Sequence, residues 1–317
     1  MAGACYYLKI TSALLNLSTC FCIDRSQRRL RLGSHAVNGF SVLIYHRVND
    51  GTDPFKIDSV STRNFENQMA YLSRNYSVLG LDEIIRMLEN HKPLPVNCVA
   101  VTFDDGYEDN YRCAFPILKQ YGLPATIFLT AGCIQKQENL WFDRILSVFK
   151  QTSQKSAELF GTMHGLEKMS DRRKAAFYCL GQLKKMENSQ RLKRIEQIES
   201  ALKEPGKDEP ACSLLKWDQI MEMSRHGISF GSHTMSHPIM AHIGLDEAEQ
   251  ELARSRALIE SRTGKKVRLF AYPNGRLEDF SDDVMRMLEK TGYKAALTTE
   301  EGINSSGTHL FKLKRYR

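Results

Sequence analysis

From Phe40 onward, short apolar runs alternate with segments in which apolar residues recur every three or four positions. The runs predict strands over residues 40–46, 76–79, 99–103, 125–129, 228–230, 267–272 and 293–298. The intervening patterns predict helices, such as one capped by Thr62 that carries the apolar stripe Phe65, Met69 and Leu72. Further helices are expected from a cap at Asp82 and over residues 109–121, 217–225, 246–262 and 281–291. This alternation implies parallel strands with helical crossovers, so we predict an α/β fold, an irregular (β/α) barrel of seven or eight parallel strands over residues 39–317.

One long stretch interrupts the alternation. Residues 141–150 have a helical pattern, and the segment from Ser153 to about Pro210 is highly charged, with helical periodicity and no strand signal. We predict a helical insertion at about residues 141–216, carried on a loop of the barrel and not forming an independent domain. Between Lys168 and Lys207 it holds eleven Lys or Arg against five Asp or Glu, with few aromatic residues. Such a run is usually a solvated helix face, so we expect no nucleic-acid partner, with contact to anionic lipid or glycan as the alternative.

The first 38 residues form a separate apolar and basic segment. Ile10 to Ile23 is an apolar run of signal-peptide length, but only Lys9 precedes it and several arginines follow it. That order favours a helix facing the cytosol or lying on the inner membrane surface over a cleaved signal. We therefore expect a protein that is cytoplasmic or peripheral at the membrane, with no later run long enough to span a bilayer.

Composition narrows the picture only a little. The hydrophobic share of 42% and the charged share of 26% are ordinary for a globular protein and exclude disorder across the whole chain. The eight cysteines lack the paired spacing of a zinc ribbon and the density of a disulfide scaffold. We interpret them as small reduced core residues and not as bridges.

Candidate chemistry is concentrated in two polar signatures at strand ends. Thr102-Phe103-Asp104-Asp105-Gly106 follows one apolar run, and Ser232-His233-Thr234-Met235-Ser236-His237 follows another. In a (β/α) barrel, functional residues gather at the carboxyl ends of the strands. Two carboxylates and two imidazoles could bind one divalent metal and leave a carboxylate free. An Asp-Asp-Gly sequence alone is as easily a polar turn, and a lone histidine pair is more often structural.

The two signatures resemble motifs of a known family, the polysaccharide deacetylases of carbohydrate esterase family 4, which share the NodB-homology domain. Residues 102–106 resemble the first motif of that family, and residues 233–237 resemble the motif that follows it. Supporting matches are Leu43-Ile44-Tyr45-His46-Arg47-Val48, Pro124-Ala125-Thr126-Ile127-Phe128 and Phe270-Ala271-Tyr272-Pro273-Asn274-Gly275. The resemblance covers roughly residues 42–297, apart from the insertion, with the motifs in the family's order.

The resemblance assigns roles residue by residue. It implies that Asp105, His233 and His237 bind a divalent metal, with zinc as the expected ion, and that Asp104 is the general base. A backbone amide near Tyr107 would stabilise the oxyanion. Tyr272 could line the sugar site, although a tyrosine before proline often only caps a barrel strand. The implied reaction removes N-acetyl groups from an N-acetylhexosamine-containing polysaccharide or oligosaccharide of the bacterial envelope. The alternatives are a related amidase or O-acetyl esterase on another substrate, or a glycan-binding member without catalysis.

Two parts of the family's pattern are missing. Many members carry an arginine in the third motif that orients the base, but Ala271 stands there, and neither Arg268 nor Arg276 is in register. The late leucine-x-histidine motif that supplies the general acid has no clear match, because the surroundings of His309 differ from it. We take His46 as the candidate proton donor, since it ends the first predicted strand, with a packing role as the alternative.

Three further side chains receive weaker predictions. Trp141 is expected to anchor the core of its helix, although it could stack on a sugar ring. Asp143 is expected to be a solvated or ion-paired carboxylate. Ser236 lacks the context of a nucleophilic serine.

Overall fold

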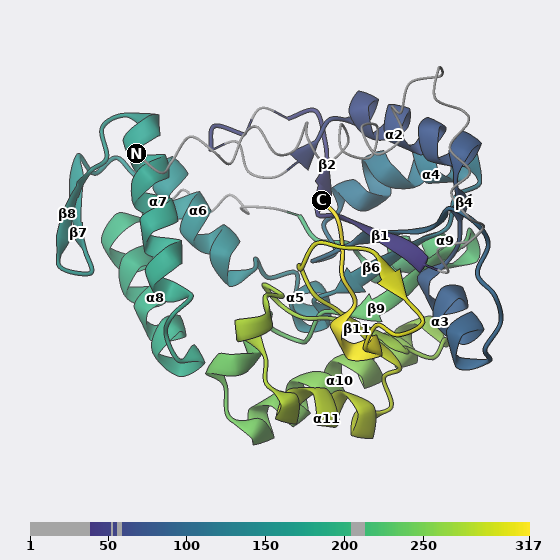
Figure 1. Ribbon diagram of the computed structural model, residues 1–317. Helices are drawn as coiled ribbons and strands as arrows, with labels where there is room; N and C mark the ends of the chain where they lie inside the picture. Colours follow the sequence, from purple (N-terminus) through teal and green to yellow (C-terminus); the bar gives the residue numbers. More distant parts are fainter. Residues whose placement is uncertain (1–38, 52, 56–58, 204–212) are drawn as a thin grey trace, which may run out of the picture.

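One curved, mostly parallel sheet forms the centre of the computed structural model, which describes residues 39–51, 53–55, 59–203 and 213–317 (Figure 1). Its eight strands are β1 Gly39–Tyr45, β4 Ser77–Val78, β5 Cys98–Phe103, β6 Ala125–Leu129, β9 Ile228–Ser232, β10 Leu269–Ala271, β11 Ala295–Leu297 and β12 Asn304–Ser305. The order is β11-β10-β9-β6-β5-β1-β12, with β4 also on β5, and β12 is antiparallel to β1. All seven predicted strands are present, which confirms the α/β barrel class. The predicted segment 1–38 lies outside the described residues.

The helices follow the predicted alternation. They are α2 Thr62–Asn75, α3 Leu81–Glu89, the π-helical turn η1 Asn110–Ala114 with α4 Phe115–Tyr121, α5 Ala131–Lys136, α9 Trp217–Arg225, α10 Leu245–Thr263 and α11 Asp282–Thr291. Short 3-10 turns occur at η2 Met240–His242, η3 Leu277–Asp279 and η4 Leu310–Lys312, and β2 Arg47–Val48 pairs with β3 Ser59–Val60. The predicted stripe of α2 is buried. Its cap, however, is Ser61, whose hydroxyl accepts from the Asn64 amide at 3.3 Å, and α3 follows Gly80 instead of being capped by Asp82.

The sheet separates two apolar layers, because successive side chains of a strand point to opposite faces. Every residue of β5 is buried, as expected for a parallel strand covered on both sides. Val99, Val101 and Phe103 belong to the cluster that includes the buried residues of α2 and α4, whereas Ala100 belongs to a second cluster that includes the buried residues of α3. This double burial fixes β5 in register and therefore fixes where its carboxyl end, with Asp104, emerges.

Residues 313–316 close the barrel between β11 and β1. The Leu313 amide donates to the Ala296 carbonyl at 3.0 Å, and the Thr298 amide donates to the Leu313 carbonyl at 2.8 Å. On the other side, Tyr316 exchanges backbone hydrogen bonds with β1, at 2.9 Å to the Ile44 amide and 2.8 Å to the Val42 carbonyl. These residues thus pair with both open edges of the sheet at once.

The insertion has its own hydrophobic cluster and lies to one side of the barrel (left in Figure 1). It consists of α6 Trp141–Gln151, a hairpin of β7 Ser156–Leu159 and β8 Thr162–Gly165, α7 Met169–Leu183 and α8 Asn188–Leu202. The hairpin corrects the prediction of an insertion without strands. Its strands are four residues long, and Phe160 and Gly161 both adopt positive φ at the turn, at 50° and 75°. A phenylalanine in that conformation gives no turn signal in a sequence.

Three of the four described cysteines are buried, as predicted. Cys98, Cys113, Cys133 and Cys179 are all free thiols, and only Cys113 is not buried. Burial raises the pKa of the Cys133 and Cys179 thiols to about 12, so both stay protonated and unreactive at neutral pH.

Candidate active site

Three predicted metal ligands meet at the carboxyl end of the sheet. Asp105 follows β5, and His233 and His237 lie on the loop after β9, with all three side chains buried. Asp105 Oδ1 is 3.5 Å from His233 Nε2 and 3.4 Å from His237 Nε2. That Oδ1 atom is buried without a hydrogen-bond partner. A buried carboxylate oxygen with no donor, facing two imidazole nitrogens, fits a divalent metal ion between them.

A backbone carbonyl orients His233. His233 Nδ1 lies 2.7 Å from the carbonyl oxygen of Ala271 in β10, which makes Nδ1 the protonated nitrogen and leaves Nε2 as the free donor atom. Burial lowers the pKa of His233 to about 4, so its ring is neutral at pH 7, as a metal ligand must be. Ala271 stands where the family's arginine was expected, and it serves the site through its main chain.

The ligand loops have an unusual backbone conformation. Asp105, Thr234 and His237 have φ of 74°, 70° and 59°, a region that residues other than glycine rarely occupy. Neighbouring groups hold it: the His237 amide donates to Thr234 Oγ1 at 3.0 Å, and Glu251 of α10 accepts from the Met235 amide at 2.6 Å. Because strain of this kind persists only where surrounding contacts impose it, it is typical of a functional site.

Glycines allow the two ligand loops to approach their neighbours. Gly106 has φ of +81°, and a β-carbon there would lie 2.9 Å from an Ile134 methyl group. A β-carbon on Gly132 in α5 would lie 2.6 Å from the Met235 carbonyl oxygen, which accepts from the Gly132 amide at 3.0 Å. The start of α5 therefore packs directly on the histidine loop, and only glycine fits at that contact.

Asp104 forms a buried ion pair that the sequence did not reveal. Arg315 Nη1 and Nη2 donate to its two carboxylate oxygens at 2.7 and 2.8 Å, and Arg315 is 1% exposed. Burial alone would raise the pKa of Asp104, but the Arg315 guanidinium, with help from His233, holds it well below its usual range. Arg315 thus fills the place of the missing arginine from a different part of the chain. Arg268 instead forms ion pairs with Asp82 and Glu89.

His46 lies close to both aspartates. It directly follows β1 and is half-buried, and its charged form would lower the pKa of Asp104 and of Asp105. The Asn110 side chain donates to the His46 carbonyl at 2.9 Å and fixes the turn. His309, in contrast, is exposed at the start of η4, where its Nδ1 accepts from the Phe311 amide at 3.1 Å.

The two predicted substrate-contacting tyrosines have different surroundings. Tyr272 has no exposed surface: its ring stacks on Phe280 at 3.8 Å, and its hydroxyl donates to the Phe311 carbonyl at 3.1 Å. This burial argues against the predicted contact of Tyr272 with a sugar and makes it a packing residue. Tyr107 is 3% exposed, and its hydroxyl donates to Asp143 Oδ2 at 2.8 Å. Its ring is therefore enclosed as well, which leaves its backbone amide as the group that could serve the reaction.

The start of α6 contacts the site through three consecutive residues. The Trp141 indole N–H donates to the His237 carbonyl at 3.1 Å, and the Phe142 ring meets the His237 imidazole edge to face at 5.1 Å. Asp143, expected to be solvated or ion-paired, is buried and bonded to Tyr107. The insertion, expected from the sequence only as a loop extension, therefore forms one wall of the site.

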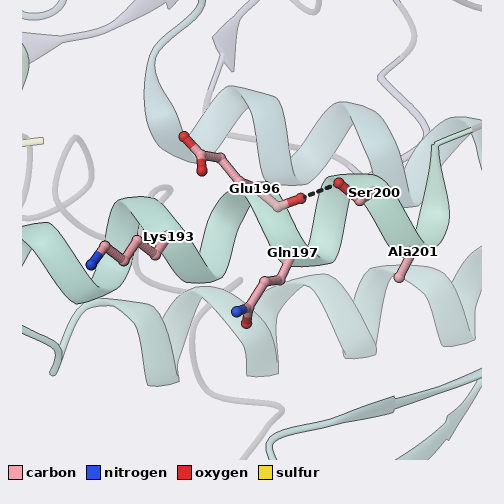
Figure 2. A pocket seen from close by; sticks show the side chains of 5 residues that line it. All are labelled: Lys193, Glu196, Gln197, Ser200 and Ala201. Carbon is pink, nitrogen blue, oxygen red and sulfur yellow. Dashed lines mark hydrogen bonds between the residues drawn. The ribbon is translucent and has the colours of Figure 1, made fainter.

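A shallow groove on the insertion is separate from this chemistry. It follows one face of α8 and is lined by Lys193, Glu196, Gln197, Ser200 and Ala201 (Figure 2). Ser200 donates to the Glu196 carbonyl at 2.8 Å, an ordinary bond along a helix. None of the predicted site residues lines this groove.

Comparison with known proteins supports the assignment suggested by the motifs. The sequence profile of the polysaccharide deacetylase family matches residues 91–296. The chain belongs to that family. As a polysaccharide deacetylase, it is an enzyme of a family of metal-dependent amide hydrolases.

Individual relatives agree with this assignment. The chain is 26% identical over 277 residues to YxkH, a Bacillus subtilis protein named as a polysaccharide deacetylase, covering 87% of this deacetylase and 70% of YxkH. It is 30% identical over 218 residues to the poly-β-1,6-N-acetyl-D-glucosamine N-deacetylase of Staphylococcus epidermidis, covering 61% and 72% of the two chains. The Streptococcus pyogenes deacetylase PplD, solved with acetate, superposes with a TM-score of 0.60 at 21% identity, over 87% and 91% of the chains. This last likeness supports the fold.

Within the described ranges, none of the helices is both long and apolar enough to cross a bilayer.

Proposed function

We propose that this deacetylase removes N-acetyl groups from a glycan that contains N-acetylhexosamine, using a divalent metal ion, with zinc as the first choice. The observation that carries the proposal is the buried set of Asp105, His233 and His237 beside an ionised Asp104. Two imidazoles and one carboxylate match the ligand set of catalytic zinc sites. When bound there, the ion would polarise the acetamide carbonyl and lower the pKa of a water molecule.

The chain's own residues would move the protons. Asp104 takes the proton of the attacking water as general base, while Arg315 keeps the carboxylate ionised and fixed in orientation. The backbone amide of Tyr107 donates to the oxyanion of the tetrahedral intermediate. His46 then gives a proton to the amine nitrogen as the C–N bond breaks, which releases acetate and leaves a free amine on the sugar.

The substrate class is inferred from the relatives. The Staphylococcus epidermidis relative is named for poly-β-1,6-N-acetyl-D-glucosamine, so a β-1,6-linked N-acetylglucosamine oligomer is the first substrate to test. The ligand set recognises a carbonyl group and not the atoms behind it. An O-acetylated glycan therefore belongs in the same assay, because an O-acetyl ester presents the same carbonyl.

The direct test is acetate release by the zinc- or cobalt-loaded enzyme. We expect acetate release from β-1,6-linked N-acetylglucosamine oligomers, and an O-acetylated analogue in the same assay separates an N-deacetylase from an O-acetyl esterase. Asp104→Asn should abolish turnover and leave the metal content unchanged. Absence of acetate from every N-acetylhexosamine oligomer would refute the proposal, and a fully active Asp104→Asn variant would refute the assignment of the base.

The proton donor requires its own comparison. His46→Asn should lower kcat and remove the basic limb of the pH–rate profile, because that limb reports loss of the proton from the acid. His309→Asn is the matched control, since His309 is exposed at η4 and should leave the profile intact. An unchanged basic limb in His46→Asn would mean that another group protonates the amine.

A further inference from the structure

A buried carboxyl group of the insertion lies beside the site without a role in the proposed reaction. Asp143 of α6 is 5% exposed, and its Oδ2 accepts from the Tyr107 hydroxyl at 2.8 Å. Two cations that act on it electrostatically, Arg47 and Lys150, form ion pairs with Asp109 and Asp53. Burial raises the pKa of Asp143 to about 7, with the Tyr107 hydroxyl and nearby cations acting in the opposite direction.

Stability does not explain a carboxyl group at this position. A buried carboxyl with one neutral partner loses its hydration and gains a single hydrogen bond, so an apolar residue of similar size would be at least as stable there. A buried acid that is kept despite this loss is a candidate functional residue. Its hydrogen bond to the Tyr107 hydroxyl indicates that Asp143 acts on Tyr107.

Tyr107 connects Asp143 to the reacting groups. Tyr107 follows Asp105 and Gly106 directly in the sequence, so only a short stretch of backbone separates the proposed metal ligand Asp105 from the phenol. The guanidinium of Arg47 lies 4.8 Å from the centre of the Tyr107 ring and is paired with Asp109 at 2.8 Å. The ring is therefore held on its face by Arg47 and at its hydroxyl by Asp143.

The same helix start also holds the second ligand loop. Trp141 donates to the His237 carbonyl at 3.1 Å, so one rigid turn of α6 contacts both loops that carry metal ligands. Removing the Asp143 contact alone would release the Tyr107 side of the site and leave the Trp141 contact with His237 in place.

We propose that Asp143 is a positioning residue of the deacetylation reaction: it holds the Tyr107 phenol and thereby places the Tyr107 backbone amide at the developing oxyanion. This inference rests on the proposed function. It assigns the insertion a part in transition-state stabilisation, since a donor to an oxyanion is effective only when its direction is fixed beforehand.

The test compares Asp143→Leu, Asp143→Asn and Tyr107→Phe in the zinc-loaded enzyme. Asp143→Leu and Tyr107→Phe should each lower kcat about 10- to 100-fold with KM within about twofold and metal content unchanged. The double variant should be no slower than either single variant, because both changes break one contact. Asp143→Asn keeps an oxygen that can accept from the phenol and should restore kcat to within about fivefold of the wild type.

Two control variants test whether the effect on kcat is specific to the hydrogen bond between Asp143 and Tyr107. Tyr111→Phe removes a phenol-to-carboxylate hydrogen bond of 2.7 Å on the surface, to Glu222, and should leave kcat unchanged. Asp171→Asn changes a carboxylate on the surface of the insertion and should also leave kcat unchanged. Amide hydrogen exchange of the peptide spanning residues 103–108 supplies a readout besides activity, and it should rise in Asp143→Leu and Tyr107→Phe only.

The outcomes are distinguishable. Unchanged kcat and unchanged exchange in Asp143→Leu would overturn the inference while the activity of the wild type still stood. Loss of metal from Asp143→Leu would overturn it in favour of a role in metal binding. A kcat as low in Asp143→Asn as in Asp143→Leu would overturn it in favour of proton donation by Asp143. If the wild type releases no acetate, the proposed function fails, and the exchange experiment alone then decides whether Asp143 holds Tyr107.

Discussion

At the scale of single residues, the two adjacent aspartates differ in their hydrogen-bond partners. Asp105 Oδ1 has no hydrogen-bond donor, whereas both oxygens of Asp104 accept from Arg315. The two carboxylates are therefore suited to different roles in the proposed reaction. The unpartnered oxygen fits a cation, and the paired carboxylate stays ionised and oriented.

Arg315→Met should damage both stability and the pH range of activity. The variant leaves Asp104 buried without its cation, which costs about 3–5 kcal/mol of unfolding free energy. The pKa of Asp104 rises, and since the base must be ionised, the acid limb of the pH–rate profile moves to higher pH. Urea unfolding and the pH dependence of kcat/KM measure the two effects. Arg286→Met, which breaks an exposed ion pair, should change neither. An acid limb that stays in place in Arg315→Met would contradict the role of Arg315.

The lowered pKa of His233 predicts that the stability of the metal-free protein depends on pH. Its pKa is about 4 when folded and near 6.5 when unfolded. Between these values the unfolded chain takes up a proton that the folded chain does not, so stability falls as the pH decreases below 6.5. At pH 5 the loss from this group is on the order of 2 kcal/mol. Chemical unfolding of chelator-treated protein at pH 7 and pH 5 measures it. The loss should shrink in His233→Gln, and an identical loss in both proteins would show that other groups cause it.

At the scale of elements, the start of α6 is the part of the insertion that matters to the site. Its residues 141–143 contact His237 and Tyr107, whereas the rest of the insertion packs mainly on its own cluster. A helix whose far side is held by a separate core can present fixed side chains to the loops that carry the ligands. We expect substitutions at this helix start to affect the site more than global stability.

Trp141→Phe should weaken metal binding. The change keeps an aromatic ring and removes the hydrogen bond to the His237 carbonyl, which helps to hold a ligand loop with positive φ. Loss of such a supporting contact typically weakens metal affinity by about 10-fold or more. Competition with a coloured chelator gives the zinc dissociation constant. Trp217→Phe is the matched control, because its indole N–H donates to Gln135 at the surface. Equal dissociation constants for Trp141→Phe and the wild type would contradict this role.

Features encoded by adjacent residues could be predicted from the sequence, whereas features formed by residues far apart in the chain could not. α9 and α10 were predicted within a residue at each end, because long amphipathic helices carry their pattern in adjacent residues. The candidate metal ligands were predicted from two short contiguous motifs, and the structure brings their three side chains together. Arg315 escaped prediction because it is 211 residues from Asp104, and no pattern around it indicates pairing. The β7–β8 hairpin was missed because its strands are too short to show alternation.

At the scale of the whole molecule, the closure of the barrel and the chemistry of the site depend on the same residues. Leu313 pairs with β11 and Tyr316 pairs with β1, while the side chain of Arg315 between them reaches Asp104. Arg315 is held further by its own donation to the Thr298 carbonyl at 2.8 Å. The seam that closes the barrel therefore also orients Asp104, the proposed base.

A chain that ends at Lys312 should lose more than the Arg315 contact. It would expose the edges of β1 and β11 and remove Leu313, which is fully buried in the barrel interior. Lost backbone hydrogen bonds and the cavity left by Leu313 should lower the unfolding free energy by at least about 3 kcal/mol beyond Arg315→Met. Urea unfolding of the two variants side by side measures the difference, and unpaired edges should also promote aggregation, which light scattering detects. Equal stability of the truncated chain and Arg315→Met would mean that residues 313–316 serve only to deliver the arginine. A larger loss in the truncated chain would show that residues 313–316 stabilise the sheet in addition to delivering Arg315 to Asp104.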